Sequence, residues 1–109
     1  MGKTFNEAYV GDIVYILHNG GTLSEAKITQ YDRGKTFNMI SIYTGDEKIG
    51  FCTQANKSSK LVPELHGTVY VDLEDVMEAI EEQVRIMKKK LDFLQMSQVK
   101  VSVKLKEQK

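Results

Sequence analysis

The feature that most constrains this 109-residue sequence is an apolar stripe in its second half. Its members follow one another at intervals of three and four residues, which places them on one side of an α-helix. Asp72 offers an N-cap oxygen just before the stripe, and Glu74 and Asp75 occupy the first turn, where the helix dipole favours negative charge. The pattern predicts one long amphipathic helix over residues 72–97. The stripe consists of Leu73, Val76, Ile80, Val84, Met87, Leu91 and Leu94.

The charge of the predicted helix changes sign along its length. Dipole complementarity and i,i+4 pairs, such as Glu81 with Arg85 and Lys88 with Asp92, account for part of this layout. Antiparallel pairing of two copies accounts for it as well, since each acidic half would lie beside the basic half of the other copy. The acidic half contains Asp72, Glu74, Asp75, Glu78, Glu81 and Glu82, and the basic half contains Arg85, Lys88, Lys89 and Lys90.

The stripe is longer than a small β-body can readily cover, which predicts a homodimer. We assign self-association to an apolar seam of Val84, Met87, Leu91 and Leu94. Polar contacts to a partner are assigned to Arg85, Lys88, Lys89 and Lys90.

The residues before the helix read as short strands separated by turns. Asn19-Gly20 is a strong hairpin signal, because both residues tolerate positive φ. We therefore expect an α+β chain whose residues 1–71 form a small antiparallel β-barrel body of about five strands. The expected strands cover residues 13–17, 22–31, 36–43, 48–53 and 68–71, and residues 54–60 are expected to form a mobile surface loop.

Residues 98–109 form a basic tail with a different pattern. Val99, Val101, Val103 and Leu105 alternate with polar residues, which is the period of a β-strand. The tail is therefore predicted to add a strand to a sheet, with a frayed, disordered end as the alternative.

Composition excludes several classes of protein. Lysine plus arginine equal aspartate plus glutamate at 15 each, so no global field directs the chain toward nucleic acid. Cys52 is the only cysteine, which rules out an intrachain disulfide and fits a reducing compartment. The N-terminus lacks the layout of a signal peptide, and the longest apolar run, residues 13–17, is too short to cross a membrane. These features predict a cytoplasmic protein without membrane association.

The sequence shows no concentration of catalytic groups. His18 and His66 stand beside turns, where histidine is usually solvated, and Cys52 follows Phe51 in a predicted strand, where a buried, inert thiol is expected. Their spacing suits no zinc site, and no glycine motif for phosphate precedes a helix. We therefore expect a non-enzymatic binding protein without a metal or cofactor.

Nucleic-acid binding is the main alternative. From Arg85 to Lys109 there are eight basic and two acidic residues, a local excess that suits phosphate backbones. A further alternative is a sponge that holds a small nucleotide signal between protomers. The aromatic residues that either stack on bases or simply form the core are Tyr15, Tyr31, Phe37, Tyr43 and Phe51.

Three segments resemble small phage and prophage accessory proteins with an SH3-like barrel. They are Val10-Gly11-Asp12-Ile13-Val14-Tyr15, Glu25-Ala26-Lys27-Ile28-Thr29, and Thr68-Val69-Tyr70-Val71-Asp72-Leu73-Glu74-Asp75-Val76. The resemblance covers about two-thirds of the chain. It implies an SH3-like body and a protein that inhibits or modulates a bacterial protein, for example as an anti-CRISPR-like inhibitor of a defence nuclease in the host cytoplasm.

Overall fold

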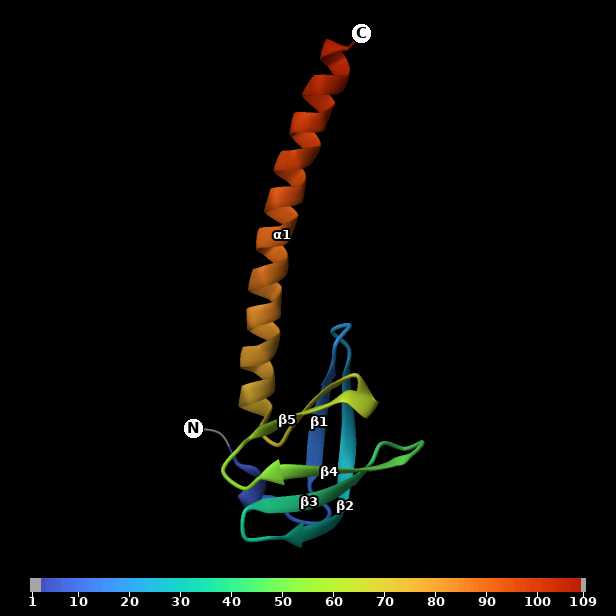
Figure 1. Ribbon diagram of the computed structural model, residues 1–109, viewed down its shortest axis with the longest axis vertical. Helices are drawn as coiled ribbons and strands as arrows, with labels where there is room; N and C mark the ends of the chain where they lie inside the picture. The colour runs from blue at the N-terminus through green and yellow to red at the C-terminus, as the bar shows by residue number, and fades with distance from the viewer. Residues whose placement is uncertain (1–2, 109) are drawn as a thin grey trace. The chain divides into compact units, whose positions relative to one another are not determined.

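The computed structural model describes residues 3–108 and has an α+β fold (Figure 1). Six antiparallel strands form a nearly closed barrel, which one long helix follows in the chain, as the sequence predicted. The elements are η1 (Phe5–Glu7), β1 (Ile13–His18), β2 (Leu23–Arg33), β3 (Phe37–Tyr43), β4 (Lys48–Gln54), β5 (Ser59–Val62), η2 (Pro63–Leu65), β6 (Gly67–Tyr70) and α1 (Leu73–Glu107).

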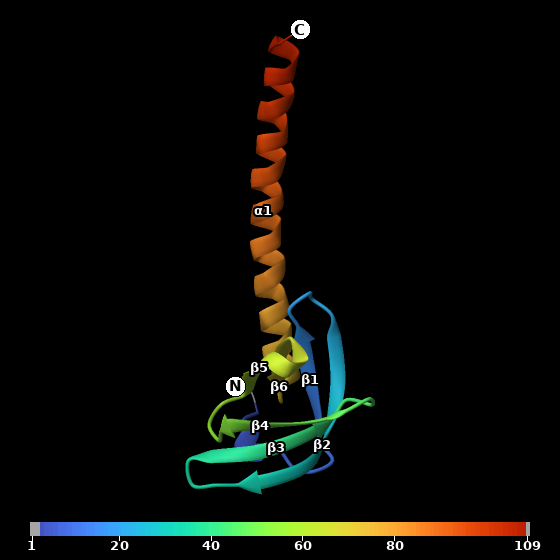
Figure 2. The ribbon, with the colours of Figure 1, turned by 45° about the vertical axis from the view of Figure 1, so that its right-hand side comes forward.

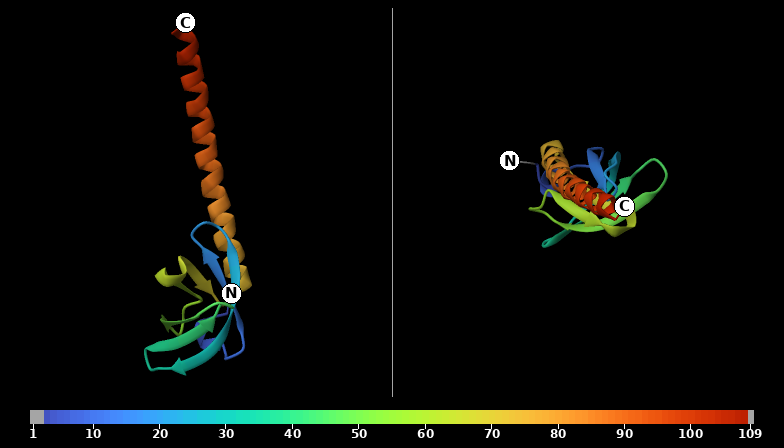
Figure 3. Two further views of the ribbon diagram at one scale, coloured as in Figure 1. Left: turned by 90° about the vertical axis from the view of Figure 1, so that its right-hand side faces the viewer. Right: turned by 90° about the horizontal axis from the view of Figure 1, so that it is seen from above.

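The sheet has the order β4-β3-β2-β1-β6-β5 and curls on itself (Figure 3). The predicted hairpin at Asn19-Gly20 joins β1 to β2, and Gly21 in its loop has a φ of 98°. The order leaves β4 and β5 as the two edges of the sheet.

A β-bulge in β2 turns the barrel wall. The pairing register between β2 and β3 shifts between Ile28 and Gln30. Ala26 and Ile28 point inward before the bulge, whereas Tyr31 is the partly buried residue after it, so the inward side changes from even to odd positions. Figure 2 shows β2 bending as it passes from β1 to β3.

Alternate strand residues and a segment near the N-terminus fill the barrel. Phe5 in η1 is fully buried, and its ring meets the ring of Phe51 edge to face with 6.1 Å between centroids. Its amide donates to the Lys57 carbonyl at 2.8 Å, and its carbonyl accepts the Tyr31 hydroxyl. The other core residues are Ala8, Val14, Ile16, Ala26, Ile28, Ile40, Ile42, Val62, Leu65, Val69 and Val71.

The sequence did not predict one of the six strands. β5 lies partly inside the expected loop of residues 54–60 and ends just before Pro63, a residue that lacks the amide hydrogen a strand ladder uses. It exists because Ser59 to Val62 pair with the whole of β6, and because Val62 is buried in the core. Tertiary pairing therefore overrode a weak local signal.

Helix α1 begins where the sequence predicted. The Asp72 carboxylate accepts a hydrogen bond of 2.8 Å from the Glu74 amide, as an N-cap should. Figure 1 shows α1 as one continuous coil. The chain forms two compact units, which meet between Met77 and Glu78 in the sequence.

The prediction of a strand-like tail was wrong for residues 98–108, because α1 continues to Glu107; residue 109 lies outside the described residues. No glycine or proline follows Pro63 except Gly67, so nothing in the tail stops the helix. Each further helical residue forms its own backbone hydrogen bond without a new nucleus, whereas a strand needs a neighbour. In the helix, Val99 and Val103 become i,i+4 neighbours, as do Val101 and Leu105.

Acid is expected to destabilise the barrel through Asp12. Its carboxylate accepts a hydrogen bond of 3.0 Å from the Lys3 side chain and another from the Tyr9 amide, and these bonds hold its pKa below the ordinary value of 3.8. A lowered folded-state pKa gives stability that is present above this value and lost as the pH falls below it. We expect the melting temperature to fall below pH 3.8. In Asp12→Asn this fall should be shallower, and an unchanged slope would contradict the assignment.

Candidate interaction surfaces

The second unit consists of helix without a covering layer. Every described residue of α1 from Glu81 onward is exposed, and no side chain there is buried. The apolar seam predicted from the sequence is accordingly open to solvent. Val84 is 47% exposed, Leu91 53%, Leu94 67% and Met87 70%. Side chains of this type normally lie in a core or an interface.

The helix carries the seam further than the sequence analysis predicted. With Val84 and Leu91 as a positions and Met87 and Leu94 as d positions, the alternation of three and four residues continues without interruption to Leu105. We call the full set the heptad stripe. It consists of Ile80, Val84, Met87, Leu91, Leu94, Gln98, Val101 and Leu105, and Gln98 is its only polar member.

A second set of apolar residues lies on the other side of the helix. Each member is two residues from a member of the heptad stripe, a rotation of roughly 200° at 3.6 residues per turn. Phe93, for example, follows Leu91 by two and is 68% exposed. We call this set the opposite stripe, and it consists of Ile86, Phe93, Met96, Val99 and Val103.

The four basic residues predicted to contact a partner are exposed but do not form one cluster. Lys88, Lys89 and Lys90 are consecutive, so they point in three directions about 100° apart. Arg85 hydrogen-bonds Glu82, three residues earlier, and not Glu81 as predicted; the bond to Glu82 raises the pKa of the guanidinium above its ordinary value. Lys88 and Lys90 occupy e and g positions beside the heptad stripe, which suits them to an interface rim.

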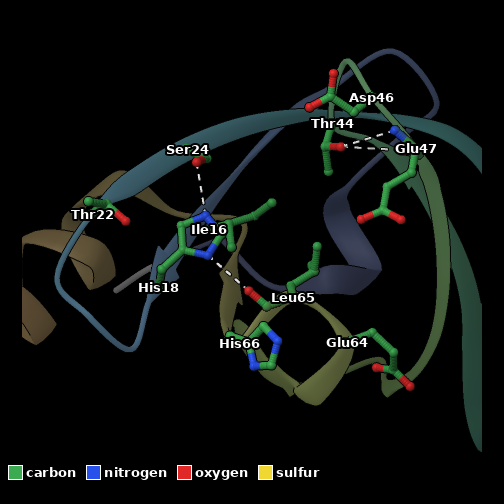
Figure 4. A pocket seen from close by; sticks show the side chains of 10 residues that line it. All are labelled: Ile16, His18, Thr22, Ser24, Thr44, Asp46, Glu47, Glu64, Leu65 and His66. Atoms are coloured by element: carbon green, nitrogen blue, oxygen red, sulfur yellow. Dashed lines mark hydrogen bonds between the residues drawn. The ribbon is translucent and has the colours of Figure 1, made fainter.

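A surface pocket in the barrel surrounds His18 (Figure 4). It has a volume of about 570 Å³ and lies between β1, β2, the β3–β4 turn and η2. His18 contacts the Leu65 carbonyl through Nδ1 and the Ser24 hydroxyl through Nε2, both at 2.9 Å. His18 is half-buried, so the expectation of a solvated histidine was wrong for this residue, whereas His66 is exposed. The acidic residues of the lining are Asp46, Glu47 and Glu64.

The hydrogen bonds of His18 define the direction of proton donation. A carbonyl oxygen only accepts, so Nδ1 carries the proton and donates it to the Leu65 carbonyl. In the neutral ring Nε2 is then an acceptor, and the Ser24 hydroxyl donates to it. The pair joins the β1–β2 hairpin to η2. The serine and histidine are arranged as in a catalytic triad, but a backbone carbonyl, and not a carboxylate, orients the histidine ring.

Removing this bridge is expected to loosen the barrel. His18→Ala deletes both bonds and should lower the free energy of unfolding by about 1–3 kcal/mol, while Ser24→Ala should lower it by about 0.5–1.5 kcal/mol. Chemical denaturation followed by circular dichroism measures both values. Thr22→Ala, on the exposed loop of the same pocket, should change stability by less than about 0.5 kcal/mol. Equal losses in Ser24→Ala and Thr22→Ala would contradict a role for the bridge.

A second groove, of about 440 Å³, lies between the two edge strands β4 and β5. Cys52 lines it and is exposed, so the expectation of a buried thiol was wrong. The residue points outward because Phe51 and Thr53 occupy the inward positions of β4. Phe37, Lys57 and Lys60 line the same groove.

The aromatic residues divide between core and surface. Phe51 belongs to the core. The Tyr31 hydroxyl forms hydrogen bonds with Phe5 and Asn38, and its ring lies against the guanidinium of Arg33. Phe37 and Tyr43 lie on the outward face of β3, 52% and 48% exposed. Of the five residues proposed to stack on bases, Phe37 and Tyr43 are exposed and Tyr15 is half-buried.

Within residues 3–108, no group of three or more histidine, cysteine, aspartate or glutamate residues is placed to hold a metal ion. No helix of this described part has both the length and the apolarity of a membrane span. Comparison of the sequence with protein-family models, with curated proteins and with solved structures found no match. Function is therefore inferred from the surfaces themselves.

Proposed function

We propose that this chain is a non-enzymatic binding protein that works as a homodimer assembled through the heptad stripe. The observation that supports it most strongly is the exposure of every member of that stripe from Val84 to Leu105. Its seven apolar residues would each contribute up to about 1.5–3 kcal/mol when buried, which is ample for association after entropic costs. A helix of 35 residues that its own chain leaves exposed from Glu81 onward fits a role in assembly.

The partner that we propose is a bacterial protein, whose activity the dimer would inhibit or modulate. The resemblance of the barrel segments to phage accessory proteins supports this class of partner. A non-enzymatic role is supported by the group that orients His18 beside Ser24, which is the Leu65 carbonyl and not a carboxylate. Lys88 and Lys90, at the rim of the stripe, remain proposed polar contacts together with Arg85 and Lys89.

A tagged pull-down from bacterial lysate, with and without nuclease, tests the partner class. One stoichiometric protein that survives nuclease treatment and is recovered again with purified components is the expected result. The same experiment with Lys88→Glu/Lys90→Glu should recover less of it, because the rim charges are reversed. If no protein co-purifies with the unmodified dimer, the proposed inhibitory role is wrong.

Nucleic-acid binding is the second candidate function, and the groove between β4 and β5 favours it. An exposed aromatic ring, Phe37, and two lysines, Lys57 and Lys60, line one groove, which suits stacking of a base beside a phosphate. We expect any such affinity to fall steeply as salt rises, because counterions are released. Fluorescence anisotropy with a labelled single strand measures this, and Phe37→Ala should weaken binding more than Tyr43→Ala. Salt-independent binding, or none at low salt, would remove this candidate.

A further inference from the structure

We infer that two copies of the helix pair as a parallel, in-register coiled coil in which Gln98 of one copy meets Gln98 of the other. The inference rests on the proposed self-association and specifies its geometry. It follows from the continuation of α1 to Glu107, which adds Gln98, Val101 and Leu105 to the interface. For a helix that ended at residue 97, the charge layout favoured an antiparallel pair. The added turns favour a parallel pair, because they extend the apolar interface and place a polar residue in it.

Gln98 discriminates between the two orientations. It occupies an a position, and in an antiparallel coiled coil an a residue packs against a d residue of the other helix. The d positions within α1 are Leu73, Ile80, Met87, Leu94 and Val101, and all are apolar. An antiparallel pair would therefore bury each Gln98 amide against a side chain that cannot hydrogen-bond. In a parallel, in-register pair the two amides lie side by side and satisfy each other.

The charges beside the stripe allow the parallel pair. In that arrangement each g residue meets the e residue five positions later in the other copy. Between Gln83 and the end of α1 at Glu107, the resulting contacts are Gln83 with Lys88, Lys90 with Gln95, and Ser97 with Ser102, none of them between like charges. The acidic residues Glu78 and Glu82 occupy b and f positions, which point away from the other helix, where salt screens their repulsion.

The antiparallel register that places opposite charges side by side has fewer apolar contacts than the parallel pair. Glu81 can face Lys88 of the other copy only when Val84 packs against Met87, and that register sets Gln98 beside Leu73 at the start of the partner helix. Val101 and Leu105 then have no helix opposite them. Two exposed ion pairs stabilise less than the apolar burial that is lost, so the parallel register is favoured.

The orientation has a consequence for partner binding. Each α1 begins at Leu73, shortly after β6 ends at Tyr70. In a parallel dimer both barrels are therefore attached at the same end of the coiled coil. Such a dimer presents two identical barrels to one target, which favours a two-fold symmetric or repeating partner through a high effective concentration.

Disulfide trapping tests the orientation. In a Cys52→Ser background, Val84→Cys should cross-link to itself in a mild redox buffer, because a positions of a parallel pair lie within disulfide reach. Val99→Cys, off the stripe, is the matched control and should stay reduced. In every antiparallel register Val84 faces a d position, so a dimer of correct mass that does not cross-link at Val84→Cys overturns the parallel assignment. A chain that is monomeric by mass would instead overturn the proposed self-association.

Gln98→Leu supplies a second readout. Replacing the single polar layer should tighten the dimer about tenfold or more while relaxing its orientation, as removal of a buried polar a residue does in coiled coils. The cross-link yield of Val84→Cys should therefore fall when Gln98→Leu is added. If Gln98→Leu changes neither the dissociation constant nor the cross-link yield, Gln98 is not in the interface.

Discussion

Leu91→Asp is expected to convert the proposed dimer into monomers and to weaken association more than a hundredfold. Leu91 lies in the middle of the heptad stripe and is 53% exposed in the single chain. The substitution would place two uncompensated carboxylates in an apolar interface, and such charges cost about 3–5 kcal/mol. Sedimentation velocity at micromolar concentration measures the change in mass.

The control for Leu91→Asp is Phe93→Asp. It makes the same change from apolar to acidic on the opposite stripe, and Phe93 is 68% exposed. We expect Phe93→Asp to remain dimeric, because it lies about 200° around the helix from Leu91. If both variants, or neither of them, dissociate, the heptad stripe is not the specific interface.

Phe5→Ala is expected to lower the free energy of unfolding of the barrel by about 3–5 kcal/mol. Phe5 is 0% exposed, and its ring packs on Phe51. Truncation removes the aromatic contact and leaves a cavity inside the barrel. For a body of this size the melting temperature should fall by at least about 12 °C.

The measurement can be confined to the barrel. All five tyrosines lie between Tyr9 and Tyr70, so the tyrosine band of the near-ultraviolet circular dichroism spectrum reports on the first unit. Val10→Ala is the control, because Val10 is 61% exposed and should shift stability by less than about 0.5 kcal/mol. A loss of less than about 1 kcal/mol in Phe5→Ala would show that the N-terminal segment does not stabilise the barrel.

The sequence predicted the barrel-plus-helix fold because periodic signals there are strong. Alternation in β2 and β3, the Asn19-Gly20 turn and the Asp72 cap each belong to one local pattern. Phe5 was missed because a single aromatic residue has no period. Its role appears only when Lys57 and Tyr31 bind its backbone across the barrel.

The site was predictable only in part. Val84, Met87, Leu91 and Leu94 were found because their spacing is helical, and the structure leaves them exposed. The extension to Leu105 was missed because valines at every second position also have the period of a strand. Local alternation cannot reveal that a preceding helix will propagate through it.

The bridge between His18 and Ser24 was not predictable from spacing. Its third member, the Leu65 carbonyl, comes from a segment 47 residues further along the chain. The outward position of Cys52 depends in the same way on the register of β4 against β3. Long-range pairing of this kind leaves no trace in one sequence.

The mass of the unmodified chain in solution tests the central claim most directly. Sedimentation equilibrium over a range of micromolar concentrations should give twice the chain mass of 12.4 kDa, with dissociation on dilution. A mass of 12.4 kDa at every concentration would contradict self-association through the heptad stripe.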